Sequence, residues 1–204
     1  MAPGAWVHVD AIQAWGRLPD ATLGATSRSL AAHKLRGPKG LGALVLSQGA
    51  KVVPVVLGGA QERGLRPGTV DPVACAGLAV AARHALDGPA RHAVLAPLRA
   101  RLEGALAGRG AVVNGSGPRA PHVSNLCFPG WSGPELVAAL DLEGVFVSSG
   151  SACSAGTLEP SAVLTALYGV ERAAASLRIS LGEETTDVEV SRALQAFEVV
   201  LGRS

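Results

Sequence analysis

Aromatic residues are scarce in this chain of 204 residues, which contains 3 Trp, 1 Tyr and 3 Phe. Aliphatic side chains and alanine must therefore fill the core, because 48% of the residues are hydrophobic. The scarcity argues against a binder of single-stranded nucleic acid, which stacks bases on aromatic side chains. The formal net charge is only +2, and basic residues are scattered among acidic ones. We therefore expect no nucleic-acid partner.

Cysteine is also rare, with Cys75, Cys127 and Cys153 as the whole set. An odd number without a C-x-x-C pair or a Cys/His cluster predicts neither a disulfide framework nor a metal site. The first residues lack the basic region and apolar run of a secretory signal, and no uncharged apolar stretch is long enough to cross a bilayer. These absences predict a cytoplasmic protein with reduced thiols and no membrane partner.

Apolar periodicity and turn residues predict short strands between helices. Few of the connections allow a parallel crossover, which favours an α+β arrangement in the second half. The break at 87–89 predicts a boundary between a domain at 1–88 and a domain at 89–204. Strands are expected at 6–9, within 22–32, and at 42–46, 51–57, 111–113, 123–128, 145–148 and 177–181. Helices are expected at 11–18, 71–86, from 89 to about 107, at 134–141, from 160 and from 186.

Proline and capping residues refine these elements. Pro54 demotes the strand at 51–57 to an edge or a bulge, because proline cannot donate a ladder hydrogen bond. Pro72 lies near the first turn of its helix, where proline is favoured. Residues 132–135 and 186–189 have the spacing of a capping box, which predicts helix starts at Ser132 and Thr186.

Cys153 stands in the stretch 147–156, in which Ser, Gly and Ala make up all other residues but Val147 and give a thiol almost no cover. Structural cysteines are usually buried among apolar neighbours, so this placement favours a reachable nucleophile. A plain surface thiol is the alternative. Cys75 and Cys127 fall in helical and strand settings, which favours packing for both.

Lys34 follows a histidine and precedes a Gly-Pro-Lys-Gly turn. A lysine partly desolvated at a sheet edge can condense with a carbonyl, although a solvated loop lysine is the alternative. Asp10 ends a strand, where open α/β sheets bind ligands, and it could instead cap a helix. Gln13 would project from the same face of the following turn. His8 alternates with Asp10 and is expected to be half-buried and hydrogen-bonded.

Arg178 is a lone charge in an apolar strand. Its guanidinium fork suits bidentate recognition of a carboxylate, and an arginine facing water from an edge strand is the alternative. The glycine-rich segment 58–69 offers backbone NH groups and the hydroxyl of Thr69, which could cradle a phosphate.

The order of the motifs is more specific than any one of them. Together they resemble the cysteine desulfurases, pyridoxal-phosphate enzymes of the class V aminotransferase group. The form at 148–153 is similar to the iron–sulfur-assembly and nitrogenase-associated branch. The resemblance implies an α/β fold, namely the C-terminal part of a fold-type I large domain followed by a smaller α+β domain. The segments that carry it are 8–13, 33–44, 58–69, 148–153 with 158–161, and 177–182.

The resemblance also implies roles for individual residues. Lys34 would hold pyridoxal 5'-phosphate through its amine, and Cys153 would take the sulfur of L-cysteine as a persulfide for an acceptor protein. Asp10 would pair with the pyridinium nitrogen and Gln13 with the phenolic oxygen. The remaining roles are contact of His33 with the phosphate, contact of Thr69 with the phosphate of a neighbouring subunit's cofactor, and binding of the substrate carboxylate by Arg178.

Two departures from the family pattern leave alternatives open. Ala31 stands where the family usually has a phosphate-binding serine, and the family's first half has no counterpart here. We expect a homodimer or a complex with a chain that supplies this half, unless the chain is a fragment. The rival functions are a non-catalytic paralogue that acts as a sulfur-transfer scaffold and a related class V enzyme such as a selenocysteine lyase.

Overall fold

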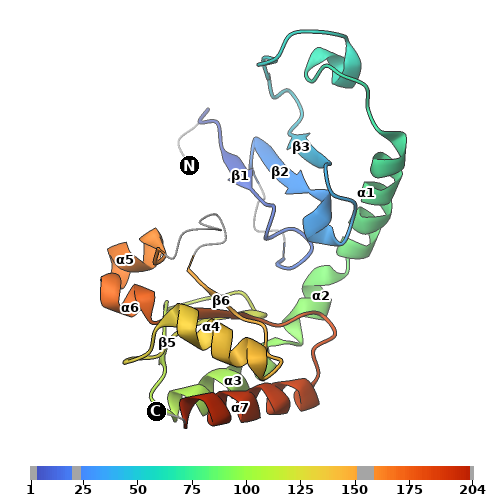
Figure 1. Cartoon of the computed structure of the whole chain (residues 1–204). Coiled ribbons are helices and arrows are strands. Elements are labelled where there is room, and N and C mark those ends of the chain that lie inside the picture. The colour runs from blue at the N-terminus through green and yellow to red at the C-terminus, as the bar shows by residue number, and fades with distance from the viewer. Residues whose placement is uncertain (1–3, 20–23, 151–158, 203–204) are drawn as a thin grey trace. The chain divides into compact units, whose positions relative to one another are not determined.

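The computed structural model describes residues 4–19, 24–150 and 159–202, and it divides the chain into two compact units, 1–91 and 92–204. The division falls inside helix α2 (Gly88–Ala93), close to the position at which the sequence predicts a domain boundary (Figure 1). Each unit has its own sheet and its own cluster of buried apolar side chains.

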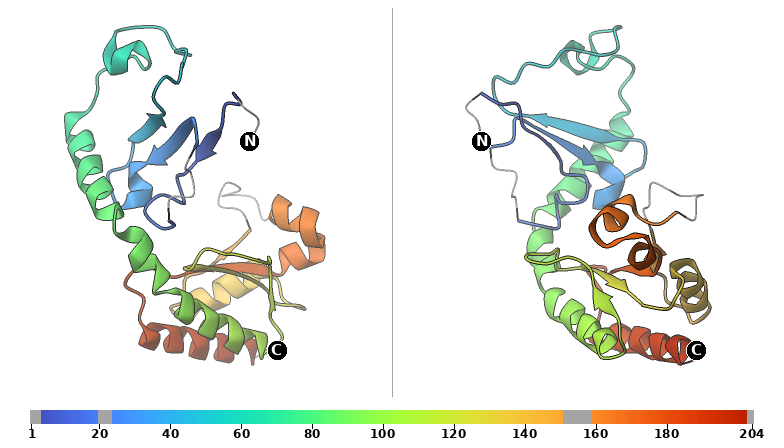
Figure 2. Two further views of the ribbon diagram at one scale, coloured as in Figure 1. Left: turned by 180° about the vertical axis from the view of Figure 1, so that it is seen from behind. Right: turned by 90° about the vertical axis from the view of Figure 1, so that its left-hand side faces the viewer.

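Unit 1 contains a three-stranded sheet with β2 (Ser27–Ala31) at its centre. Strand β1 (His8–Asp10) pairs with β2 in parallel, and β3 (Gly42–Leu46) pairs with it in antiparallel. The three strands lie side by side in both further views (Figure 2). The strands expected at 6–9, within 22–32 and at 42–46 are therefore confirmed, with ends shifted by a few residues.

Two expectations for unit 1 are wrong. Residues 11–18 form successive turns rather than a helix, with Trp15 and Leu18 donating to the carbonyls of Ala11 and Ala14. Residues 51–57 form no strand. Pro54 removes a ladder donor, and the side chain of Val55 is 97% exposed, so this valine-rich segment has no surface to pack against.

Helix α1 (Pro72–Ala85) packs against the short helix η1 (Ala32–Leu35) that follows β2. The contact consists of Leu35, Ala81 and Ala85, with Trp15 and Leu78 at its margin. Asp71 caps α1 by accepting hydrogen bonds from the next two free backbone NH groups. A second short helix, η2 (Gln61–Gly64), interrupts the segment between β3 and α1.

Unit 2 contains a four-stranded antiparallel sheet in the order β4-β5-β7-β6. This agrees with the expected α+β arrangement. Helices α3, α4 and α7 pack together on one face of this sheet (Figure 1). The strands are β4 (Val112–Val113), β5 (Val123–Cys127), β6 (Ser148–Ser149) and β7 (Ser176–Ser180), and the helices after α2 are α3 (Ala96–Ala107), α4 (Gly133–Leu142), α5 (Ala162–Tyr168), α6 (Val170–Ala174) and α7 (Asp187–Leu201).

The core of unit 2 lies where α3, α4 and α7 meet β5 and β7. Strand β7 alternates, so Leu177 and Ile179 point into this core and Arg178 points to the other face. Helix α7 contributes Phe197, which is fully buried and stacks on Phe128 at 5.6 Å between ring centroids. The apolar stripe of α7 therefore fixes the helix against the sheet.

The structure corrects several expected boundaries in unit 2. The helix expected from 89 to 107 is two helices, α2 and α3, and the strand expected at 145–148 is the shorter β6. The capping box at Thr186 is confirmed, with Glu189 accepting from the Thr186 backbone NH. Ser132 precedes α4 but makes no side-chain cap, so the spacing at 132–135 predicts the helix start and not the bond.

Candidate active site

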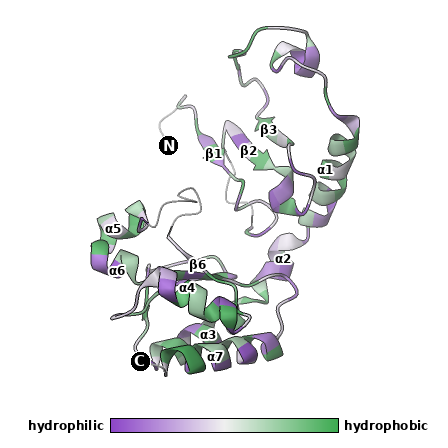
Figure 3. Ribbon diagram, viewed as in Figure 1, coloured by the Kyte–Doolittle hydropathy of each residue, from purple (hydrophilic) through white to green (hydrophobic). Residues whose placement is uncertain are grey.

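Asp10 and η1 lie at the same end of the unit 1 sheet. Asp10 is the last residue of β1 and pairs with Ser29 of the parallel β2, and η1 begins directly after β2. The carboxyl ends of parallel strands meet at one edge of a sheet, which is where open α/β sheets bind ligands. Both β1 and η1 carry hydrophilic residues at this edge (Figure 3). The structure therefore brings Asp10 and the segment of Lys34 together.

The Asp10 carboxylate accepts a hydrogen bond from the backbone NH of Ile12 at 3.0 Å. This is an Asx turn, because no helix follows the strand. The helix-cap alternative for Asp10 is therefore wrong. The side chain is exposed, and one carboxylate oxygen is enough for the turn, so the other can accept from a ligand.

Gln13 and Lys34 are joined by Arg17, a residue that sequence reasoning missed. The Arg17 guanidinium donates to the side-chain oxygen of Gln13 at 3.2 Å and to the backbone carbonyl of Lys34 at 2.6 Å. The spacing of Gln13 and Arg17, four residues apart, is a signal that could have indicated the first bond. The second bond has no sequence signal, because its acceptor is main chain.

His33 is exposed on η1 directly before Lys34, which is half-buried. The short helix ends at Arg36, whose positive φ of 65° turns the chain toward the Gly-Pro-Lys-Gly segment. His8 is exposed and lies 2.8 Å and 3.1 Å from the hydroxyls of Ser27 and Ser29. His8 is thus hydrogen-bonded as expected, although it is more exposed than predicted.

Ala31 ends β2 with its backbone paired to Gly42 and offers no hydroxyl at this edge. Ser29, two residues earlier, is opposite Asp10 in the parallel register. Its hydroxyl is within hydrogen-bonding distance of His8.

Thr69 lies in the exposed segment between η2 and α1, two residues before the Asp71 cap. Figure 1 shows the segment that joins β3 to α1 extending away from the sheet. The expected contact of Thr69 with the phosphate of a neighbouring subunit's cofactor stays a prediction.

Arg178 lies between β5 and β6, since β7 is an inner strand of the unit 2 sheet. It is opposite Asn125 of β5 and Ser148 of β6. Paired residues of neighbouring strands point to the same face, so all three lie on the face opposite to the core. The alternative that Arg178 faces water from an edge strand is wrong.

Cys153 and the segment 151–158 lie outside the described residues. The chain enters this segment after β6 and Gly150, and Ser148 of β6 is paired with Arg178. It leaves at Glu159 and reaches α5, whose start is capped by the hydroxyl of Ser161. The strand that leads to Cys153 is therefore hydrogen-bonded to the strand that carries Arg178.

A buried polar network fixes α5 and α6 to the sheet, and sequence reasoning missed it. Arg172 donates to the side-chain oxygen of Asn114 at 2.7 Å and to the carbonyl of Val113 at 3.0 Å. Its guanidinium also lies over the Tyr168 ring, 4.2 Å from the centroid. Asn114 in turn donates to the hydroxyl of Ser176 on β7. The helices that follow the Cys153 segment are thereby anchored to β4 and β7.

Cys127 is a buried thiol at the end of β5, only 4% exposed. Burial raises its pKa, and Arg172 and the hydroxyl of Ser176 offset part of that rise. A thiol with a raised pKa is a poor nucleophile near neutral pH. Cys127 therefore has the packing role expected of it.

A groove of about 620 Å³ lies in unit 2 between residues 143–147 and α7. Phe146, Ile179 and Val199 are among the residues that line it. Of the site residues predicted from the sequence, those that the structure describes are not part of it. The chemistry of those residues, rather than the volume of this groove, therefore identifies the candidate site.

Within 4–19, 24–150 and 159–202, no group of three His, Cys, Asp or Glu side chains is placed to hold a metal ion. The helices of these ranges are also too short or too polar for any of them to cross a membrane.

The family model for aminotransferase class V matches residues 2–193. The chain belongs to this family. It is 41% identical over 210 residues to an IscS-like cysteine desulfurase of Mycobacterium tuberculosis. This match covers 98% of this chain and 53% of the relative. It is 39% identical over 204 residues to a cysteine desulfurase of Cereibacter sphaeroides, covering 97% of this chain and 52% of the relative.

The fold is similar to that of a solved NifS-like protein from Rickettsia africae, with a TM-score of 0.83 and 27% identity. This similarity covers 97% of the class V chain and 54% of the solved one. The expected α/β fold, as the C-terminal part of a fold-type I enzyme, agrees with these matches. The chain spans about half the length of the curated relatives it matches.

Proposed function

We propose that this chain supplies the lysine and the cysteine of a pyridoxal-phosphate-dependent cysteine desulfurase. The reaction converts L-cysteine to L-alanine and leaves a persulfide on Cys153. An acceptor protein then takes the sulfur for the assembly of iron–sulfur clusters or thio-cofactors. The proposed working enzyme is a homodimer, or a complex with a chain that supplies the family's first half, unless this chain is a fragment.

The observation that supports the proposal is that Asp10 and the segment of Lys34 lie at the carboxyl end of β1 and β2, with Gln13 linked to the Lys34 main chain through Arg17. A carboxylate can pair with a protonated pyridine nitrogen, an amide can donate to a phenolic oxygen, and an amine can condense with an aldehyde. Asp10 has an oxygen beyond the one its turn uses, and Arg17 links Gln13 to Lys34. The donor set of unit 1 therefore fits pyridoxal phosphate.

Each residue then has a definite task. Lys34 would hold the cofactor through its amine, Asp10 would pair with the pyridine nitrogen, and His33 would contact the phosphate, with Thr69 reaching the phosphate of a neighbouring subunit. The bound cofactor supplies an electron sink for the substrate carbon. The Arg178 fork binds the carboxylate of L-cysteine, and its position beside the strand leading to Cys153 supports this role.

Cys153 carries out the sulfur transfer. Its thiolate attacks the sulfur of the bound cysteine, so that an S–S bond forms while the C–S bond of the substrate breaks. The substrate carbon keeps the electron pair of the broken bond and is protonated to give alanine. The sulfur remains on Cys153 as a persulfide, and no external oxidant or reductant is needed.

Two measurements test the proposal. The chain mixed with pyridoxal phosphate should show a visible absorbance band that is lost in Lys34→Ala. With added dithiothreitol, which reduces the persulfide and frees its outer sulfur as sulfide, release of sulfide and alanine from L-cysteine should be lost in Cys153→Ser and retained in Cys75→Ser, the matched control. Unchanged sulfide release from Cys153→Ser would remove this residue from the mechanism.

One observation favours a second function, a non-catalytic scaffold for sulfur transfer. Ala31 lacks the hydroxyl that the family uses to bind the phosphate, and a charge-assisted hydrogen bond contributes about 1.5–3 kcal/mol. The absence of a Lys34-dependent absorbance band would favour this reading over the enzyme.

A further inference from the structure

Arg17 lies on the turn that follows β1 and makes three hydrogen bonds to the candidate site. One of its terminal nitrogens donates to the backbone carbonyl of Gln13 at 3.3 Å and to the Gln13 side-chain oxygen at 3.2 Å. The other donates to the backbone carbonyl of Lys34 at 2.6 Å. A single half-buried guanidinium therefore ties the amide of one site residue to the main chain of another.

The chemistry of this contact fixes which way the Gln13 amide points. A glutamine amide has an accepting oxygen and a donating nitrogen that can exchange places by a flip of the side chain. Guanidinium only donates, so it holds the oxygen end and would repel the NH₂ end. The NH₂ group of Gln13 is thereby left to donate elsewhere.

The bond to Lys34 restrains the second partner. Helix η1 is a single turn, and short 3₁₀ turns have weaker hydrogen-bond geometry than α-helices. A charge-assisted hydrogen bond to the Lys34 carbonyl fixes the main chain at the residue whose amine is proposed to hold the cofactor. The orientation of Gln13 and the position of Lys34 are therefore coupled through Arg17.

We infer that Arg17 is a positioning residue that sets Gln13 as a hydrogen-bond donor to the phenolic oxygen of a cofactor held by Lys34. The inference rests on the proposed function, because it assigns a direction to a contact that the proposal requires. This role requires no contact between Arg17 and the cofactor. It acts through the amide of Gln13 and the carbonyl of Lys34.

A pH titration of the visible band of the full chain with pyridoxal phosphate tests this inference. An NH donor stabilises the ionised phenolic oxygen, so its loss raises the pH at which the lysine-bound cofactor gives up its proton. We expect the titration midpoint to rise by about 0.5–1 pH unit in Gln13→Ala and in Arg17→Ala. The double variant should show no larger rise than Gln13→Ala alone, since both changes remove the same contact.

Arg91→Ala is the matched control. Arg91 also donates to a backbone carbonyl of unit 1 at 2.6 Å, that of His84, in a different part of the unit. Its removal should leave the midpoint unchanged. Arg17→Lys keeps one donor group, so its titration midpoint should lie between those of wild type and Arg17→Ala.

A second readout needs no cofactor. In the NMR spectrum of the chain alone, the side-chain NH₂ signals of Gln13 should shift in Arg17→Ala and stay in place in Arg91→Ala. Unmoved signals would overturn the inference. A titration midpoint that is the same in wild type and Arg17→Ala would also overturn it, while leaving the proposed function intact. A wild-type chain without a Lys34-dependent band would overturn the proposed function and this inference together.

Discussion

Arg172 shows how a single residue can join separate parts of unit 2. Its guanidinium contacts the side chain of Asn114, the carbonyl of Val113 and the ring of Tyr168. These partners come from β4, the residue after it and α5. The residue therefore connects the sheet to the helices that follow the Cys153 segment.

Arg172→Ala should lower the free energy of unfolding by about 2–4 kcal/mol, because it removes two charge-assisted hydrogen bonds and a cation–π contact. It also leaves the buried oxygen of Asn114 without this donor. Urea unfolding of the variant measures the loss. Arg109→Ala is the control: its 3.0 Å pair with Glu198 is 38% and 62% exposed, so less than about 1 kcal/mol should be lost. Equal losses in the two variants would contradict this account.

Residue-scale prediction from the sequence succeeded where a role depends on residue type and position in a motif. Asp10, Gln13 and Lys34 were chosen this way, and the structure brings their segments together. Arg17 was missed because one of its acceptors is a main-chain carbonyl, which has no sequence signature. Arg172 was missed for a related reason, since its hydrogen-bond acceptors on Asn114 and Val113 are distant in sequence.

At the scale of elements, close approach of backbone explains one glycine of unit 2. A Cβ atom on Gly133, at the start of α4, would lie 2.7 Å from the carbonyl oxygen of Ala174 and 3.2 Å from the Cβ of Ser149. The start of α4 therefore fits against the end of α6 and β6 only without a side chain. Gly104, in the middle of α3, has nothing within 4 Å of the same point.

Gly133→Ala should therefore lower the free energy of unfolding by about 1–3 kcal/mol, the usual cost of overpacking. Gly104→Ala, the control with the same chemical change, should raise it by about 0.5–1 kcal/mol, since alanine is the better helix former. Denaturant unfolding of both variants measures the two changes in the free energy of unfolding, which should have opposite signs. A stabilised Gly133→Ala would show that α4 does not approach α6 this closely.

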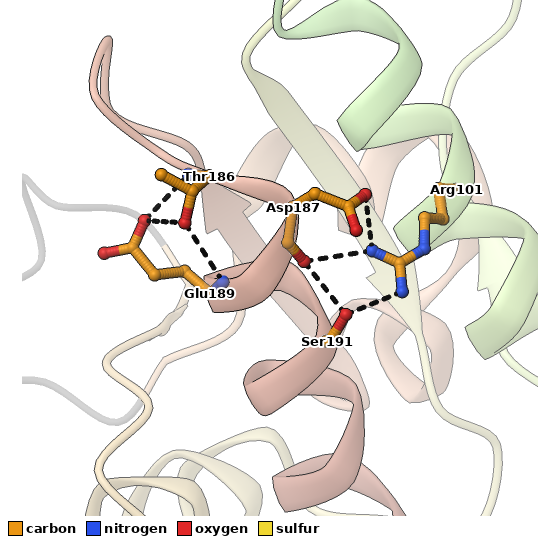
Figure 4. A network of polar contacts seen from close by, with 5 residues as sticks. All are labelled: Arg101, Thr186, Asp187, Glu189 and Ser191. Carbon is orange, nitrogen blue, oxygen red and sulfur yellow. Dashed lines mark hydrogen bonds and ion pairs between the residues drawn. The ribbon is translucent and has the colours of Figure 1, made fainter.

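The first turn of α7 contains a network of hydrogen bonds and an ion pair (Figure 4). Glu189 accepts from the backbone NH and the hydroxyl of Thr186, while Arg101 bonds to Asp187 and Ser191. The backbone NH of Thr186, then its hydroxyl, hold the pKa of Glu189 below its usual value, and Arg192 adds a small attraction. The carboxylate is thus the form that stabilises this helix start.

The folded pKa of Glu189 lies below the unfolded value of about 4.3. Its contribution to stability is fully present above about pH 4.3 and is lost as the pH falls through the folded pKa. An NMR titration of the Glu189 carboxyl carbon should show the lowered pKa, and Thr186→Ala should return it part of the way. A Glu189 that titrates at its usual pH would contradict the capping box.

Element prediction from the sequence worked best where the signal was local. The starts of α1 and α7 follow from Asp71 and Thr186, which bond to backbone groups within three residues. The segment 51–57 was predicted as a strand from its valines, but a strand requires a neighbour that the sequence does not reveal. The turns at 11–18 were predicted as a helix because apolar spacing alone does not exclude a series of turns.

At the scale of the whole molecule, the two units differ in how much they bury. The buried cluster of unit 1 consists of Leu35, Ala81 and Ala85, whereas that of unit 2 draws on three helices and two strands. Unit 1 also exposes Val55 and Leu57, which are 97% and 85% accessible. Exposed apolar stretches of this kind mark surfaces that are covered in an assembly.

The purified chain should therefore self-associate, and light scattering should report particles heavier than one chain as concentration rises. Replacing Val55 and Leu57 together by Glu should shift the population toward single chains. Val163→Glu, a change at an exposed apolar residue of α5, serves as the control and should have little effect. Single chains at every concentration, with cooperative melting, would count against a covered surface at 53–57.

The account depends on attachment of the cofactor to one amine. Borohydride reduction of the chain with pyridoxal phosphate, followed by peptide mass spectrometry, reads that attachment directly. We predict that the reduced cofactor is found on Lys34, that it is absent from Lys34→Ala, and that Lys39 and Lys51 of the same unit remain unmodified. Labelling spread over these lysines, or none at Lys34, would contradict the assignment.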